Sequence, residues 1–527
     1  MNRFLLLVAS TFLLIGCGGG SSSGSTGSAE SSSSDFTKQN KTIAINSSSS
    51  IYRVKGAKSS DLELNIDSKK DIFVIVTSRF NNQDISIGSK VASAPRGSGS
   101  LSPRRARGIT QMRKEINDIL FSKSKATPRA RLLNTRERVI SQVSTKSDAN
   151  FCVDMDSFHN CLEYVGASVK KIVKNIKTPQ GSKSLVIWLQ DGNNLSQSSI
   201  DKLADTFLKS GEDNDIYDWV SNVYGKEWGS EANYIDSKLI HNSDIIDILV
   251  YNMNNYGLAG YFWGKDNFKR SEVGASNEKI MFYINSELLK RDPKETYTTL
   301  AHEFQHMIHF YQRSVIKGIE DAAWYDELMS EATEDLVATK IGYMGPRHVD
   351  SYNGTAGRAG NRGGRYPNFN RYNTAALTTW QNTTRDYSKV SAFGGYLLRN
   401  YGGANFLKRM MYTNNQDEYG VLDATKEKSF SDLIANWGVA VLLSDTIDAS
   451  NKFRYNFGDF RYTELNDITY ELGSVNFFNY APQPMFKSSA KLDKNANLYY
   501  KVGDNISGNI KLHINIPKGA DITIVAK

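Results

Sequence analysis

The H-E-x-x-H pattern at His302–His306 constrains this chain more than any other feature. Histidines four positions apart lie on one face of a helix, so both imidazoles can reach a single metal ion. Glu303 follows the first histidine, where its carboxylate can face the open position of the metal and accept a proton from water. Apolar residues recur around the pattern at helical spacing: Leu300, Ala301, Phe304, Met307 and Ile308. The helix should therefore be buried, and a metal ion is the simplest compensation for burying two imidazoles and a carboxylate.

A catalytic zinc site usually has three protein ligands, so two histidines leave this one incomplete. Glu327 lies 21 positions after His306, which leaves room for a turn and a second helix packed on the first, and we predict it as the third ligand. Glu331 follows one helical turn later on the same face, where it could accept a hydrogen bond from a ligand histidine, and Glu334 is its rival. His309, one turn past His306, could compete for the metal. Glu327 is favoured because sites built on H-E-x-x-H take their third ligand from a separate element.

These residues resemble a known family. H-E-F-Q-H followed by W-x-D-E-x-x-S-x-x-x-E-D is similar to the hyicolysin family of bacterial metallopeptidases, within the gluzincins. The resemblance implies one catalytic Zn²⁺ held by His302, His306 and Glu327, with Glu303 as general base. It also implies an α+β fold, in which a mixed sheet precedes an active-site helix and a helical C-terminal lobe follows. One departure is Asp326, which stands where such families usually have Asn.

A second resemblance concerns Tyr387, in the run Tyr-Ser-Lys-Val that is similar to the Y-x-K-G segment of gluzincin aminopeptidases. The resemblance implies that its hydroxyl stabilises the oxyanion of the transition state, for which a phenol donor is well suited. Val390 replaces the usual glycine, and an ordinary structural tyrosine is the alternative, because the chain has 27 of them. Glu278 lies in a run faintly similar to the aminopeptidase motif that anchors a free N-terminus, although the residue order differs.

The N-terminus reads as a targeting segment. Residues 1–16 have a short charged start and an apolar stretch too short to span a bilayer, as in a signal peptide. Leu-Ile-Gly-Cys ending at Cys17 resembles a bacterial lipobox, in which the cysteine is lipidated and anchors the chain to a membrane surface. The alternative is an ordinary signal peptide with an incidental cysteine. We therefore expect a protein of the bacterial cell envelope, anchored on the outer membrane or cell surface or released into the periplasm or medium.

The other segments follow from composition and periodicity. Residues 17–40 are a Gly/Ser tether, and 41–89 alternate as a small β-domain. Residues 90–150 form a basic linker or pro-region, with an amphipathic helix expected near 111–121. The peptidase domain is expected at 151–484, and a C-terminal β-module at 485–527.

The net charge of +8 comes from one segment, because residues 90–148 carry 14 Lys or Arg against 4 acidic residues. The rest of the chain is nearly neutral, which argues against a nucleic-acid-binding protein. Cys152 and Cys161 are the two cysteines left after the lipobox, and in an exported chain they read as one disulfide.

The sequence thus predicts a monomeric, lipid-anchored zinc endopeptidase that acts on extracytoplasmic protein or peptide substrates. Two alternatives remain open. One is a surface adhesion or binding lipoprotein that carries an inactive metallopeptidase fold, and the other is a zinc aminopeptidase.

Overall fold

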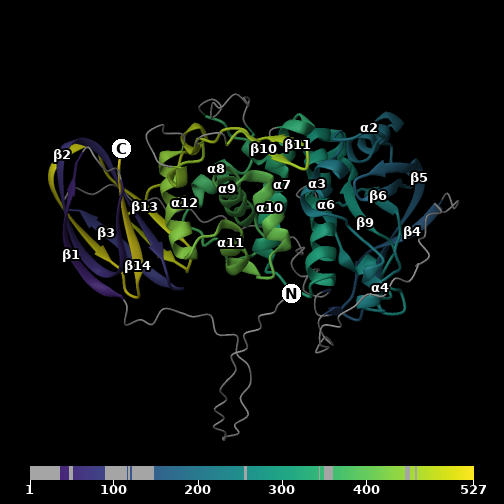
Figure 1. The fold of residues 1–527 in the computed structure, drawn as a ribbon, viewed down its shortest axis with the longest axis horizontal. Coiled ribbons are helices and arrows are strands. Elements are labelled where there is room, and N and C mark those ends of the chain that lie inside the picture. Colours follow the sequence, from purple (N-terminus) through teal and green to yellow (C-terminus); the bar gives the residue numbers. More distant parts are fainter. Residues whose placement is uncertain are drawn as a thin grey trace, which may run out of the picture. The chain divides into compact units, whose positions relative to one another are not determined.

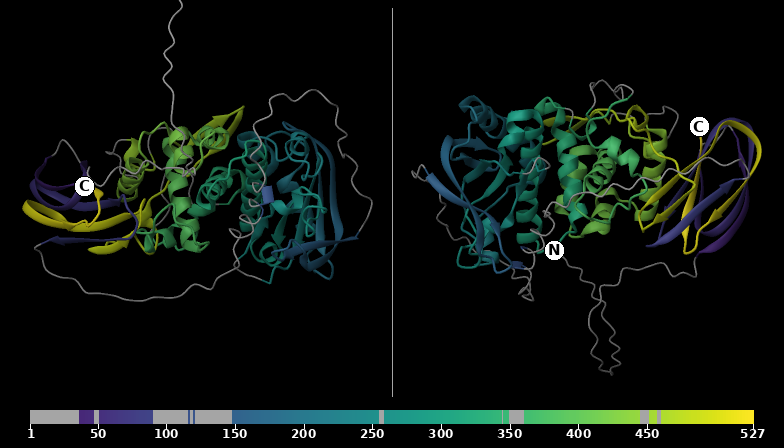
Figure 2. Two further views of the ribbon diagram at one scale, coloured as in Figure 1. Left: turned by 90° about the horizontal axis from the view of Figure 1, so that it is seen from below. Right: turned by 180° about the vertical axis from the view of Figure 1, so that it is seen from behind.

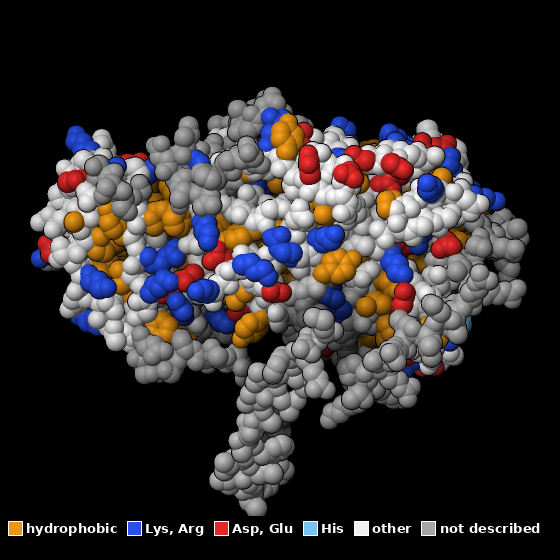
Figure 3. Space-filling view, viewed as in Figure 1, with side chains coloured by type: hydrophobic (Ala, Val, Ile, Leu, Met, Phe, Trp, Pro, Cys, Tyr) orange, Lys and Arg blue, Asp and Glu red, His pale blue; other side chains and the backbone are white. Residues whose placement is uncertain are grey.

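The computed structural model describes residues 36–46, 51–89, 116, 119–120, 148–254, 258–343, 345–348, 360–444, 451–456 and 460–527. The predicted signal peptide, Cys17 and nearly all of the Gly/Ser tether lie outside these residues. None of the described helices has the length and apolar character that a membrane span requires. On the face drawn in Figure 3, Lys and Arg side chains are interspersed with Asp and Glu.

One six-stranded sheet of mixed direction is formed by strands from residues 148–285 (Figure 1). Its order is β4-β5-β6-β7-β9-β8, with β6, β7 and β9 parallel and the other pairs antiparallel. The strands are β4 (Asp148–Met155), β5 (Cys161–Thr178), β6 (Gly181–Gln190), β7 (Ile245–Tyr251), β8 (Gly260–Phe262) and β9 (Met281–Asn285). The central strands are continuous buried apolar runs, as parallel strands covered on both faces must be. The short strand β8 forms an edge of this sheet.

Helices cover this sheet, and α6 is buried from Thr296 to its end at His309. The helices between and after its strands are α2 (Gln197–Phe207), α3 (Ile216–Tyr224), α4 (Glu231–Ile235), α5 (Ser286–Arg291) and α6 (Pro293–His309). Helix α6 begins with a cap, in which the Asp292 carboxylate accepts from the backbone N–H of Glu295, and with Pro293 at a position where no N–H is needed. Phe304 packs against Phe207 and Tyr217 with ring centroids 5.2 Å apart in both pairs, which anchors the inner face of the helix.

A helical lobe follows α6, after a π-helical turn at Phe310–Val315. Its helices are α7 (Ala323–Ile341), α8 (Tyr366–Arg371), α9 (Thr384–Asn400), α10 (Gly403–Tyr412), α11 (Asp417–Thr425) and α12 (Phe430–Leu443). A hairpin of β10 (Tyr462–Leu465) and β11 (Ile468–Glu471) follows them in the chain. Helix α9 comes very close to α7 at Gly394. A Cβ added at this glycine would lie only 3.2 Å from the Cβ of Ala332. Behind this contact, the buried Asp335 carboxylate pairs with Arg347 at 2.6 Å and Arg399 at 2.6 Å. Helix α7 is thus fixed on both sides.

The two β-modules expected at 41–89 and 485–527 are in fact one module. Its strands are β1 (Thr37–Ile45), β2 (Ile51–Ser78), β3 (Gln83–Ser89), β12 (Ser489–Leu492), β13 (Asn497–Asn515) and β14 (Ala520–Ala526). They form one sheet in the order β1-β2-β13-β3-β12, and β14 also pairs with β2. Figure 2 shows the N-terminal strands in purple beside the C-terminal strands in yellow. The alternation of apolar and polar residues predicts strands in both segments, but it does not predict that the two segments pair in one sheet.

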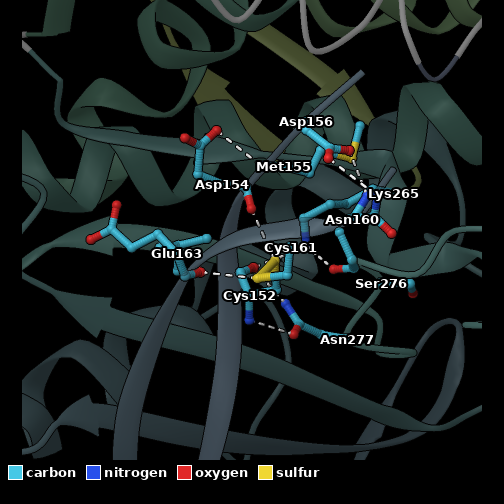
Figure 4. Close-up of a disulfide and its surroundings, with 12 residues drawn as sticks. Cys152, Asp154, Met155, Asp156, Asn160, Cys161, Glu163, Lys265, Ser276 and Asn277 are labelled. Carbon is cyan, nitrogen blue, oxygen red and sulfur yellow. Dashed lines mark hydrogen bonds between the residues drawn. A yellow bond between two sulfur atoms is a disulfide. The ribbon is translucent and has the colours of Figure 1, made fainter. Parts of the chain in front are cut away.

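A disulfide joins Cys152 of β4 to Cys161 at the start of β5 (Figure 4). The backbone of Cys152 is held from the other side by Asn277, whose side chain accepts from the Cys152 N–H at 2.9 Å and donates to the Cys152 carbonyl at 3.1 Å. The buried ammonium of Lys265 also donates to that carbonyl, at 3.0 Å. Since Lys265 lies just after β8, the disulfide hairpin is tied to the edge of the sheet that faces α6.

Candidate metal centre

Helices α6 and α7 pack against each other and bring His302, His306 and Glu327 together. One nitrogen or oxygen of each side chain lies within 4.8 Å of the others. The Glu327 Oε2 atom is 3.2 Å from His302 Nε2 and 3.6 Å from His306 Nε2. All three residues are at most 7 % exposed, so the group is buried. The three ligands predicted from the sequence therefore form one cluster.

The other ring nitrogen of each histidine faces a second carboxylate. His302 Nδ1 is 2.7 Å from Glu334 Oε1, and His306 Nδ1 is 3.0 Å from Asp326 Oδ1. An ionised carboxylate can only accept, so both Nδ1 atoms carry the proton in these bonds. The Nε2 atoms then present lone pairs toward Glu327. Carboxylates placed in this way fix the orientation of ligand histidines and increase their basicity.

This donor set fits a divalent transition metal such as zinc. Two imidazole nitrogens and a carboxylate oxygen are zinc donors, and three protein ligands with an open position are typical of a catalytic site. Without a cation, the lone pairs of His302 Nε2 and Glu327 Oε2 would face each other. Burial alone would lower the pKa of His302, but its hydrogen bonds to Glu327 and Glu334 hold the pKa well above its usual value. The cluster is therefore a place that favours positive charge.

Glu303 lies on the same helix and points to the edge of the sheet. Its Oε2 atom accepts a hydrogen bond of 2.8 Å from the backbone N–H of Phe262, at the end of β8. Glu303 is 4 % exposed. The carboxylate predicted as general base is thus positioned by the strand along which an extended peptide could lie.

Glu331 does not contact the Nδ1 atom of His302, the role for which the sequence favoured it over Glu334. Its carboxylate pairs with Arg365, at 2.7 Å to one guanidinium nitrogen and 3.1 Å to Nε. Burial raises the pKa of Glu331 to about 7, although Arg365 opposes the shift. In the structure Glu334, the rival, is the residue that holds His302.

Tyr387 lies in the first turn of α9, with its hydroxyl 3.5 Å from Glu327 Oε1 and 3.2 Å from Asn382 Oδ1. The guanidinium of Arg365 lies over its ring, 5.4 Å from the centroid. The hydroxyl is therefore beside a ligand of the predicted metal, which is where an oxyanion donor is needed. Arg365, which contacts both Glu331 and Tyr387, carries no signal in the sequence that could have identified it.

His309 faces Asp326 through its Nδ1 atom, at 3.5 Å from Oδ1, and Asp321 through its other ring nitrogen. Its Nε2 atom is 3.1 Å from Asp321 Oδ2, and Asp321 is also paired with the buried Arg313. Glu278 is exposed, and its carboxylate accepts a 2.8 Å hydrogen bond from the backbone N–H of Arg270. The described contacts of Glu278 are thus local ones.

A cavity of about 220 Å³ borders the site. It lies between the end of β8, the last turn of α6 and the start of α7. The residues that line it are Ile116, Phe262, Trp263, Gly264, His306, His309, Phe310, Ser314, Glu320, Asp321, Ala322, Ala323 and Asp326. One of them, His306, is a predicted ligand, and another, Asp326, is the partner of its Nδ1 atom, so the cavity opens beside the predicted reaction centre.

Sequence reasoning missed the role of Asp326, which it noted only as a departure from Asn. The signal was present, because a carboxylate directly before a ligand glutamate can face the neighbouring ligand histidine. It also missed the N–H of Phe262, which no side-chain pattern reveals.

Comparison with known proteins supports the same chemistry. A family model described as Peptidase M30 matches residues 167–527. The neutral metalloprotease ShpI of Staphylococcus hyicus is 28% identical over 148 residues, which cover 24% of this chain and 33% of the relative. The alignment therefore spans about a third of that protein's length.

Proposed function

Because the chain belongs to the peptidase M30 family, we propose that it is a zinc-dependent endopeptidase that hydrolyses extracytoplasmic proteins or peptides. One observation carries the proposal. Two imidazole Nε2 atoms converge on the Glu327 carboxylate, while the Nδ1 atoms of both rings are held by Glu334 and Asp326. Such a preorganised donor set is what a catalytic zinc site requires.

His302, His306 and Glu327 would hold the ion. Zinc bound there would supply a Lewis acid for the scissile carbonyl and would bring the pKa of a water molecule toward neutrality. Glu334 and Asp326 keep the two imidazoles in one tautomer, so that the Nε2 lone pairs stay aimed at the metal position.

Glu303 would act as the general base. Its carboxylate accepts the proton of the attacking water and then passes it to the amine that leaves. The Phe262 N–H holds the carboxylate at the sheet edge, where a substrate strand can add to β8. The base is therefore beside the peptide bond that an added strand would present.

Tyr387 would donate a hydrogen bond to the oxyanion as it forms. The hydroxyl lies on the Glu327 side of the cluster, and Arg365 over its ring restricts its position. Replacement of this donor by Phe should lower kcat by roughly 10²- to 10³-fold without loss of zinc.

The test pairs metal content with cleavage of casein, on the soluble chain from Ser34 and on its Glu303→Gln variant. We expect one zinc per chain in both, and cleavage in the parent with a roughly 10²- to 10⁴-fold loss in the variant. Normal turnover by Glu303→Gln would refute the mechanism. A chain without zinc would refute the ligand assignment and favour the binding-protein alternative.

The endopeptidase is preferred to its two alternatives. An inactive binding lipoprotein would be expected to have lost part of the cluster, yet both histidines, Glu303 and Glu327 are all present. An aminopeptidase needs an anchor for a free amine, and Glu278 is exposed and bonded to Arg270. Cleavage confined to free N-termini would revive that alternative.

We also propose that lipidation of Cys17 anchors the protein in the bacterial cell envelope, on the outer membrane or cell surface, or that it is released. The support is the lipobox-like sequence alone. Incorporation of labelled palmitate, lost on Cys17→Ser, tests this.

A further inference from the structure

Three residues of the basic segment are packed into the catalytic half of the protein. Ile116 is 2% exposed and Leu120 is 8% exposed, and both belong to the core that contains the sheet and α6. Ile119 is partly buried against the same core, and its carbonyl accepts from the Lys238 ammonium at 3.4 Å. The spacing i, i+3, i+4 is that of one helix face. The segment expected as a solvated linker therefore docks at this point.

Ile116 borders the cavity beside the predicted reaction centre. It lines the cavity of about 220 Å³ to which His306 and Asp326 also belong. Gly264, just after β8, leaves the room that Ile116 uses, because a Cβ there would lie 3.2 Å from Ile116 Cγ2 and 3.1 Å from the Phe310 ring. An aliphatic side chain of this chain thus lies next to the residues that follow the edge strand β8, and lines the same cavity as the predicted ligand His306.

The cavity has walls of two kinds. Phe262, Trp263 and Phe310 supply aromatic surface, which suits an aliphatic side chain. Asp321 and Asp326 supply carboxylates on the α7 side, which would repel an acidic side chain. The cavity, one wall of which is Ile116 itself, therefore suits an aliphatic side chain better than an acidic one.

We propose that this cavity is a substrate subsite for an aliphatic side chain, and that Ile116, Ile119 and Leu120 belong to an internal inhibitor, whose Ile116 side chain forms one wall of the cavity and narrows it. The inference rests on the proposed peptidase function and adds to it a preference for Ile or Leu near the scissile bond. In the intact chain, Ile116 takes up room at the edge of the subsite that a bound substrate would need.

The first test compares kcat/KM for fluorescein-labelled casein in the chain from Ser34 and in its Ile116→Asp variant. We expect an increase of about tenfold or more, since the variant loses the burial of one aliphatic side chain and brings a charge toward carboxylates. Ile235→Asp is the matched control, because Ile235 is 50% exposed at the end of α4, and its turnover should equal that of the parent. Zinc content and thermal unfolding show whether each variant is folded.

A second design covers a variant that fails to fold. Recognition sites for a sequence-specific protease are inserted in 90–110 and in 122–147, so that two cuts release the segment. Release should raise turnover to the level of Ile116→Asp, and a synthetic peptide of residues 111–121 should then raise KM without changing kcat. The same peptide with Ile116→Asp should not inhibit.

The outcomes separate this inference from the proposed function. An active parent with no increase in Ile116→Asp or after release would overturn the inhibitor and leave the peptidase intact. If no form cleaves casein, binding of the fluorescein-labelled peptide to the released protein decides. If the peptide binds and its binding requires Ile116, the docking site is supported and the peptidase assignment is what fails. If the peptide does not bind, the docking of the segment is overturned.

Discussion

The hydrogen bond from His302 Nδ1 to Glu334 gives the sharpest prediction about the metal centre. The bond is 2.7 Å long, buried and made to a charged acceptor, whereas Glu334→Gln keeps the shape but offers only a neutral one. Hydrogen bonds to charged groups contribute roughly 1 kcal/mol more than neutral ones, and carboxylate partners of ligand histidines change metal affinity about 10- to 100-fold. We therefore expect zinc to bind Glu334→Gln at least about tenfold more weakly, which is about 1.4 kcal/mol.

Glu331→Gln is the matched control, because it makes the same chemical change one helical turn earlier on α7. Its carboxylate pairs with Arg365 at 2.7 Å rather than with His302 Nδ1, so we expect zinc affinity to change by less than about threefold. Zinc dissociation constants are measured by competition with a chromophoric chelator. The zinc-dependent increase in thermal stability gives an independent value, since ligand binding stabilises the folded state. Weaker zinc binding by Glu331→Gln than by Glu334→Gln would refute the assignment.

Three further predictions concern stability and chain cleavage. Burial raises the pKa of Asp335, but its two arginine partners outweigh this and lower it, so Asp335→Asn should destabilise the fold by about 3–5 kcal/mol at pH 7. This difference in chemical denaturation should begin to shrink below about pH 4, where Asp335 of the unfolded chain takes up a proton, and should be lost as the pH falls through the lowered pKa of the folded state. Cys152→Ala with Cys161→Ala should cost about 2–3 kcal/mol, because a short loop is no longer closed, while zinc content at 25 °C stays the same. A cut within 121–147 should leave the fragment that contains 36–89 bound to the rest during gel filtration, because its strands share a sheet with the C-terminal ones.

The predicted ligands could be read from the sequence because their geometry is local. His302 and His306 need only a helix, and Glu327 needs only a second helix packed on the first. Partners of the Nδ1 atoms are different, since Glu331 and Glu334 lie on the same face of α7. Which of them reaches His302 depends on how α7 crosses α6, and spacing along one helix does not determine that crossing. The structure shows Glu334 in contact, with Glu331 turned to Arg365.

Strand pairing in the β-module could likewise not be predicted from the sequence. Alternation identifies the buried face of 41–89 and of 485–527, but period two does not determine which strand pairs with which. Strand β2 pairs with β13 in a register that places Leu64 opposite Ile510. The two residues come from nearly opposite ends of the sequence. A pro-region that ends at residue 150 would therefore remove three strands from this sheet. Cleavage within 90–150 would therefore leave 36–89 paired with the C-terminal strands rather than release it.

The position of the internal inhibitor between two fixed strands determines how it can be released. It is attached to β3, which ends at Ser89, and to β4, which begins at Asp148. A ligand tethered to its binding site within the same chain, over a linker of this length, has an effective concentration on the order of 1 mM. A segment that binds as a free peptide with a dissociation constant of about 10 μM would therefore be about 99% docked in the intact chain. A single cut, such as one in the arginine-rich run near residue 105, leaves the other tether in place.

Activation should therefore require two cuts, one on each side of Ile116. With the two inserted protease sites, the chain cut only in 90–110 or only in 122–147 should keep the low kcat/KM of the intact protein. Only the doubly cut chain, diluted below the dissociation constant of the free segment, should gain activity. Full activity after one cut would show that the segment docks too weakly to inhibit from a single tether, and the effective-concentration argument would fail.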